Sequence, residues 1–111
     1  MKKLIIFLLF ILVPIALQAS DAKIDGVYYN FDKEKKTATV TYKFSDAYVD
    51  DANKNAYSGD VVIPEVVFYN NVAYNVTAIG SKAFKYCKDI TSLTIPKSIR
   101  SIGSFAFYGC I

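Results

Sequence analysis

Two copies of a ten-residue segment, which we call the phrase, occur near the end of this 111-residue chain. They limit the possible folds of the chain more than any other feature does. "AIGSKAFKYC" at residues 78–87 returns as "SIGSFAFYGC" at residues 101–110. The matched positions are 23 residues apart: Val76, Ile79, Gly80, Ala83, Phe84 and Cys87 recur as Ile99, Ile102, Gly103, Ala106, Phe107 and Cys110. A fixed period of this length indicates stacked repeats, in which each unit buries its apolar side chains against its neighbours.

A short strand is predicted between the two phrases. In "ITSLTIPKS", apolar and polar residues alternate, so Leu93 and Ile95 are expected to point inward, and Pro96 ends the strand. "DVVIPE" is an earlier copy that ends at Pro64. It is followed by two further short strands around Asn70-Asn71, a pair that tolerates the left-handed backbone of a tight turn. This inserted hairpin accounts for the longer spacing to the next phrase.

The region before the repeats is predicted to be a β-hairpin followed by a loop. The runs "GVYYNF" at residues 26–31 and "TATVTYKF" at residues 37–44 are rich in β-branched and aromatic side chains, and a polar turn joins them. The polar segment at residues 45–60 is predicted to be a loop.

The first residues are typical of a secretory signal peptide. Lys2 and Lys3 precede an apolar run that is too short to span a membrane comfortably, and small residues follow it. Cleavage is expected after Ala19, with Ala22 as the alternative. Loss of the two lysines reduces the 13 Lys and Arg to 11, against 10 Asp and Glu. This nearly neutral balance argues against nucleic acid as a partner.

The pattern of isoleucine, glycine, "AF" and cysteine positions in "IP(x)5IGxxAFxxC" resembles the BspA-type leucine-rich repeat. The fold expected is therefore mainly β with short helical turns. Residues 1–19 form the signal peptide, residues 20–59 an N-terminal β-hairpin cap and loop, and residues 60–111 a truncated leucine-rich-repeat region. The resemblance implies a secreted or cell-surface adhesion module that binds extracellular protein or matrix ligands. The alternative is a truncated cap fragment of a longer repeat protein, with only a structural role.

Catalysis, cofactors and metals are not expected. The chain has no His, which removes the commonest general base and metal ligand, and its five Gly form no phosphate-binding loop. The family motif carries no catalytic residue. Asp51, Asn53 and Asn55 have the spacing of calcium ligands, but Val62 stands where the bidentate Glu of an EF-hand loop belongs, so a polar surface loop is favoured.

Strand alternation locates the expected binding face. If Leu93 points inward, Ser92 and Thr94 point outward, and Asp60 and Val62 do so on the equivalent strand. These four residues are the predicted ligand-binding positions. Their patch is small, so weak or multivalent binding is expected.

The two cysteines and the last residues carry further expectations. Cys87 and Cys110 occupy the same repeat position, so their side chains should point inward in parallel, and two free thiols are favoured over a disulfide. The phrase "FAFYGCI" leaves Phe105, Phe107 and Ile111 at an open repeat end, where self-association is expected.

Overall fold

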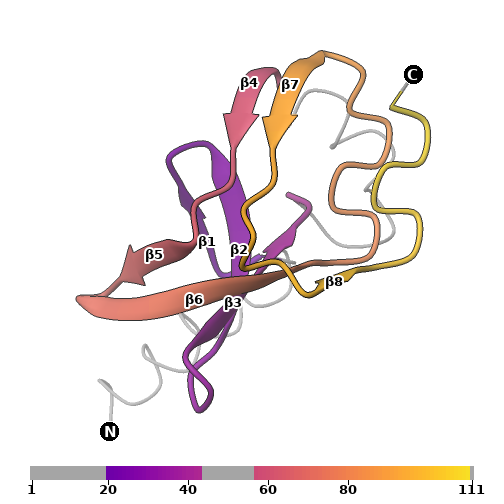
Figure 1. The fold of residues 1–111 in the computed structure, drawn as a ribbon. Coiled ribbons are helices and arrows are strands. Elements are labelled where there is room, and N and C mark those ends of the chain that lie inside the picture. Colours follow the sequence, from indigo (N-terminus) through magenta and orange to yellow (C-terminus); the bar gives the residue numbers. More distant parts are fainter. Residues whose placement is uncertain (1–19, 44–56, 111) are drawn as a thin grey trace, which may run out of the picture.

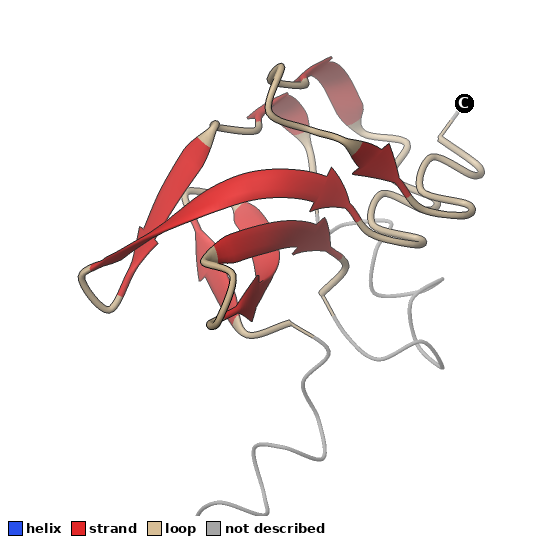
Figure 2. Ribbon diagram, turned by 60° about the horizontal axis from the view of Figure 1, so that its bottom comes forward, coloured by secondary structure: helices blue, strands red, loops and turns tan. Residues whose placement is uncertain are grey.

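The computed structural model describes residues 20–43 and 57–110 (Figure 1). This part of the chain consists of strands joined by turns and has no helix (Figure 2). The strands are β1 Ala22–Ile24, β2 Val27–Asp32, β3 Thr37–Thr41, β4 Gly59–Val62, β5 Val66–Tyr69, β6 Val72–Ile79, β7 Ile90–Thr94 and β8 Ser101–Ile102. The expectation of a mainly β fold is therefore confirmed.

The two predicted hairpins are present. β2 and β3 pair antiparallel with Tyr29 opposite Val40, and β5 and β6 pair antiparallel on either side of the Asn70-Asn71 turn. Both asparagines have positive φ, 50° and 64°, as a two-residue hairpin turn requires. β1 is a third antiparallel strand, not predicted from the sequence, and it pairs with β2.

The parallel strands β3, β6 and β8, each with the segment that follows it, form stacked units that we call rungs. The hairpin therefore does more than cover the repeats, because its strand β3 begins the first rung. β3 runs parallel to β6 with Val40 opposite Ile79, and β6 runs parallel to β8 with Ile79 opposite Ile102. The same hydrogen bond recurs at both steps: the Gly80 N–H donates to the Val40 carbonyl, and the Gly103 N–H donates to the Ile79 carbonyl, each at 2.7 Å. Three successive rungs are thus in register.

A second, two-stranded sheet is formed by β4 and β7, which lie side by side and parallel in Figure 1. Val61 lies opposite Leu93 and is buried, whereas Leu93 is only partly buried. The expectation that Ile95 points inward was wrong, since it is 43% exposed. β7 ends at Thr94, and only the β4 rung packs beside this segment in the described residues, so one side of Ile95 remains uncovered.

The return segments of the two phrases are chains of tight turns, where short helical turns were expected. In residues 81–86 and 104–109, N–H groups bond three residues back, as from Lys85 to the Lys82 carbonyl and from Tyr108 to the Phe105 carbonyl, each at 3.2 Å. Positive φ recurs at equivalent positions, with 61° at Lys82 and 58° at Phe105. Figure 1 shows the two meanders stacked side by side, and the Phe84 N–H bonds to the Ala106 carbonyl across them at 2.8 Å.

An aromatic column runs through the core and joins the rungs. The ring of Tyr57 lies 4.6 Å from that of Phe84, which stacks at 5.6 Å on Phe107. Tyr57 therefore supplies the core aromatic ring of the first rung, as Phe84 and Phe107 do in the next two. This role was not predicted from the sequence. Its hydroxyl donates to the Thr41 carbonyl at 2.8 Å and accepts from the Tyr28 N–H at 3.0 Å, which fastens the column to the hairpin.

Candidate functional site

The four predicted ligand-binding residues lie together on one exposed face, which we call the sheet face. Asp60 is opposite Ser92, and Val62 is opposite Thr94, in the parallel pairing of β4 with β7. All four are exposed, Val62 by 61%. The structure therefore brings them into one patch, and whether the patch binds a ligand stays a prediction.

Hydrogen bonds organise the acidic end of the sheet face. The Asp60 carboxylate accepts from the Ser92 hydroxyl at 2.7 Å and from the Thr91 hydroxyl at 3.1 Å. Both bonds lower the pKa of Asp60, because they stabilise its charged form, and the bond from Ser92 has the larger effect. A fixed negative charge therefore stands beside two hydroxyl groups on an otherwise neutral patch.

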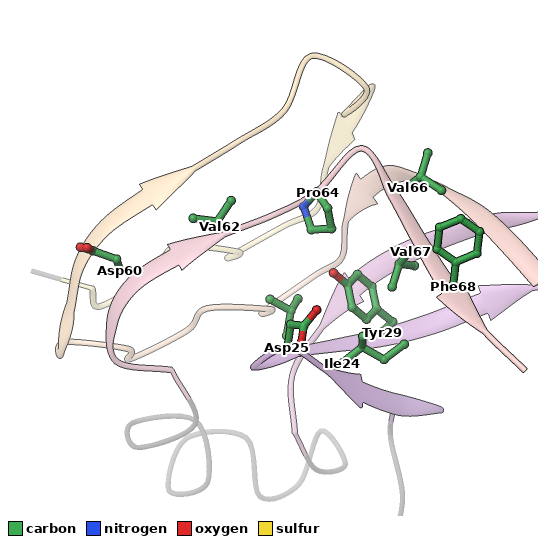
Figure 3. A pocket seen from close by; sticks show the side chains of 10 residues that line it. Ile24, Asp25, Tyr29, Asp60, Val62, Pro64, Val66, Val67 and Phe68 are labelled. Atoms are coloured by element: carbon green, nitrogen blue, oxygen red, sulfur yellow. The ribbon is translucent and has the colours of Figure 1, made fainter. Parts of the chain in front are cut away.

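A groove that the sequence analysis did not foresee lies next to the sheet face, between β4 and the β1–β2 turn (Figure 3). Its volume is about 680 Å³. The floor is apolar and is formed by the buried residues Val27, Tyr29 and Val67. We call this hollow the β4 groove.

The two walls of the β4 groove differ in character. The chain from β4 to β5 contributes exposed apolar side chains, with Val62 at 61%, Val66 at 40% and Phe68 at 69% exposure. The opposite wall carries Ile24 and Asp25, as Figure 3 shows. A smaller hollow of about 210 Å³ shares Asp25, Val27, Asp60 and Val62 with the groove and extends it toward Tyr57. The walls thus offer apolar surface along one side and one carboxylate on each side, Asp60 from β4 and Asp25 from the β1–β2 turn.

Both cysteines are free thiols in the structure. Cys87 is buried, and the Cys110 thiol donates to the Phe84 carbonyl at 2.8 Å. The pKa of Cys87 is raised to about 12, mainly by burial and to a smaller extent by the nearby Cys110. Burial also raises the pKa of Cys110. A thiol with a raised pKa is a poor nucleophile at neutral pH. The pair therefore behaves as core side chains.

The described residues hold no cluster of three or more metal-ligating side chains. The calcium-like spacing of Asp51, Asn53 and Asn55 lies outside the described residues. Within residues 20–43 and 57–110, no helix is long and apolar enough to cross a membrane.

Solved structures similar to this chain include three leucine-rich-repeat proteins. A leucine-rich repeat protein from Bacteroides ovatus ATCC 8483 is 36% identical with a TM-score of 0.64, over 81% of this chain and 21% of its own length. One from Bacteroides capillosus ATCC 29799 is 30% identical with a TM-score of 0.59, over 80% of this chain and 58% of its own. A leucine rich cell surface protein from Faecalibacterium prausnitzii A2-165 is 27% identical with a TM-score of 0.59, over 80% of this chain and 21% of its own.

The chain thus spans about a fifth of the length of the Bacteroides ovatus protein, 21%. No curated protein matches it. The family model described as BspA type leucine rich repeat region (6 copies) matches residues 50–111, which is more than half of the chain. These residues include both copies of the repeated phrase and the strands β4 and β7 that carry the sheet face. The chain belongs to the BspA-type leucine-rich repeat family.

Proposed function

We propose that this chain is an exported, non-catalytic binding module that uses the sheet face to hold an extracellular protein or matrix ligand. The observation that carries the proposal is the pairing of Asp60 with Ser92 and of Val62 with Thr94, which gathers four exposed side chains from two rungs on one face. Repeat stacking makes such a face continuous, and this is how solenoids build extended binding surfaces.

Export is supported by the signal-like leader. The contacts of Asp21, just after the leader, bear on where the leader is cleaved. Asp21 is tied to the hairpin: its carboxylate accepts from the Phe31 N–H at 2.9 Å, and its own N–H bonds to the Tyr29 carbonyl at 2.8 Å. Cleavage after Ala19 keeps these bonds, whereas cleavage after Ala22 removes them together with the first residue of β1. We therefore favour Ala19 as the cleavage site. A similar solved protein is described as a cell surface protein, which agrees with a secreted or surface location.

The test is capture of purified matrix proteins by residues 20–111. A panel of collagen, laminin and fibronectin is immobilised, and binding of wild type is compared with that of the double variant Ser92→Glu/Thr94→Glu. The matched control is Ser81→Glu/Ser104→Glu, which adds the same charge at two exposed return-turn positions. We expect the sheet-face variant to bind at least about tenfold more weakly, because two new charges must be desolvated in the contact. Equal capture by a folded sheet-face variant would remove this face from consideration.

A structural role within a longer repeat protein is the second candidate. Ile102 and Phe105 on the last rung are 52% and 60% exposed, and such surface is what a further rung would cover. If capture of every matrix protein is absent while the fold is intact, this second role is favoured.

A further inference from the structure

The outer edge of β4 presents unpaired backbone to the β4 groove. In its pairing with β7, the Gly59 N–H bonds to the Asp89 carbonyl at 2.9 Å, and the Ile63 N–H bonds to the Thr94 carbonyl at 3.0 Å. Since alternate residues of a strand direct their backbone groups to opposite sides, the N–H and C=O groups of Asp60 and Val62 point away from β7. Of the strands in the described residues, only β7 pairs with β4. This edge can therefore accept another strand.

The groove beside that edge has exposed apolar side chains on one wall. Val62, Val66 and Phe68 are among the most exposed large apolar side chains of the described residues, and all three line the same hollow. Exposed apolar residues scattered singly are ordinary, but a contiguous set beside a concave floor is typical of a binding site. Aliphatic side chains of an added strand would contact this wall and the floor at Val27 and Val67.

The charges of the groove select among peptides. Among the described residues, Asp25 and Asp60 are the charged side chains that line the groove, and Lys23 lines the smaller hollow beside it. Asp25 lies in the β1–β2 turn, where it and Gly26 both have positive φ, 48° and 83°, and its side chain is exposed. The two carboxylates in the groove favour a partner with a basic side chain.

We propose that the edge of β4 and the β4 groove bind an extended peptide segment that carries alternating aliphatic side chains and a Lys or Arg, by addition of a strand to β4. The backbone groups of Asp60 and Val62 pair with the peptide, and the Lys or Arg lies next to the carboxylates. This is the strand-addition mode of peptide recognition, in which main-chain hydrogen bonds give affinity and side-chain contacts give selectivity. It does not depend on the sheet face being a binding surface, although Asp60 and Val62 belong to both.

The test uses a fluorescein-labelled, end-capped peptide of sequence TVKVTV with residues 20–111 of this chain. Binding is followed by fluorescence anisotropy, and the contact is mapped by amide chemical-shift changes. We expect saturable binding, with the largest shifts at residues 59–63 and 24–27. The peptide TVEVTV, which places a negative charge at the carboxylates, should bind at least about fivefold more weakly.

Two substitutions separate the backbone contribution from the charge. Val62→Pro removes the outward N–H but leaves the bonds to β7, and it should weaken TVKVTV binding about tenfold, the effect of one lost hydrogen bond plus an unpaired partner. Val62→Thr keeps that N–H and is the matched control, with an expected change of less than about threefold. Asp60→Asn should weaken binding by about two- to fivefold, as an exposed ion pair allows.

The outcomes distinguish this proposal from the sheet-face proposal. Thr94→Glu alone leaves the β4 edge and the hydrogen bond from Ser92 to Asp60 intact, so it should retain TVKVTV binding even where it weakens matrix capture. Absence of TVKVTV binding up to about 1 mM, a limit that corresponds to about 4 kcal/mol, would overturn the strand-addition proposal. So would shifts that map to another surface, or equal binding by folded Val62→Pro and Val62→Thr.

Discussion

Gly103→Ala should destabilise the chain far more than the equivalent change one rung earlier. A Cβ atom on Gly103 would lie 2.4 Å from the Ser81 backbone N and 2.8 Å from the Gly80 carbonyl C. Both are main-chain atoms of the preceding rung, so no flexible side chain can move aside. On Gly80 the added Cβ would lie 3.1 Å from the Val40 carbonyl O and 3.2 Å from a Thr39 methyl, which is tight but can be relieved by small shifts.

The magnitude follows from what must move. Relief of the Gly103 clash requires the last rung to shift away from Ser81, which stretches the 2.7 Å bond from the Gly103 N–H to the Ile79 carbonyl. Overpacking of this kind costs about 3 kcal/mol, and a lost backbone hydrogen bond adds about 1 kcal/mol. For a domain of this size, each kcal/mol lowers Tm by about 4 to 8 °C. Gly80→Ala should cost only about 1 kcal/mol.

Urea denaturation followed by circular dichroism measures both variants, and amide exchange shows where the loss falls. If Gly103→Ala releases the last rung alone, the N–H groups of Phe84 and Tyr86 lose protection, because they bond to the carbonyls of Ala106 and Tyr108 at 2.8 Å. If the rungs unfold together, the urea midpoint falls instead. A Gly103→Ala protein with the midpoint and amide protection of Gly80→Ala would refute the close stacking of these rungs.

Further predictions concern the aromatic column, the titrating core groups and the last rung. Tyr57→Phe should lower the free energy of unfolding in urea by about 2 kcal/mol, since it leaves the buried Tyr28 N–H and Thr41 carbonyl unpaired. The exposed control Tyr108→Phe should change it by less than about 0.5 kcal/mol. Equal effects would contradict the role of the Tyr57 hydroxyl in joining the column to the hairpin. Stability should fall as pH rises from about 9 to about 12, because burial raises the pKa of Cys87 and of Tyr29 to about 12, so the unfolded chain releases these protons first; a flat urea midpoint across this range would contradict it. We also propose that residues 20–111 self-associate through the exposed side chains of Ile102 and Phe105, and that one added 23-residue repeat with a polar cap, which would cover them, raises Tm and yields a monomer by light scattering. Association unchanged by the added repeat would exclude this surface as the contact.

The repeat could be predicted because its signal is written in the chain at a fixed spacing. Ile79 and Ile102 are 23 residues apart and lie directly opposite each other in the parallel pairing of β6 with β8. The first rung carries no such signal. Val40 also lies opposite Ile79, but 39 residues separate them, because the loop, β4 and the inserted hairpin intervene. Periodicity therefore could not identify β3 as a rung.

The sheet face followed from strand alternation, which is local, and the β4 groove did not. Alternation along β7 gives the side of the strand on which Ser92 and Thr94 lie, and both are exposed. The groove joins Asp25 to Val62 and Phe68, which approach each other only when the hairpin packs beside the first repeat. Exposure of Ile95 was missed for a related reason: alternation gives the side of a strand, but coverage of that side depends on the neighbouring rung.

The hairpin strand β3 is the first rung of the repeat stack rather than a separate cover. Scalar couplings across hydrogen bonds, measured by NMR between an amide nitrogen and the carbonyl carbon that accepts its proton, test this directly. We predict one coupling from Gly80 N to Val40 C′ and an equivalent coupling from Gly103 N to Ile79 C′, since both bonds are 2.7 Å long. A spectrum with the Gly103 coupling and the β2–β3 hairpin couplings but none between Gly80 and Val40 would contradict the claim, because the hairpin would then fold without joining the stack.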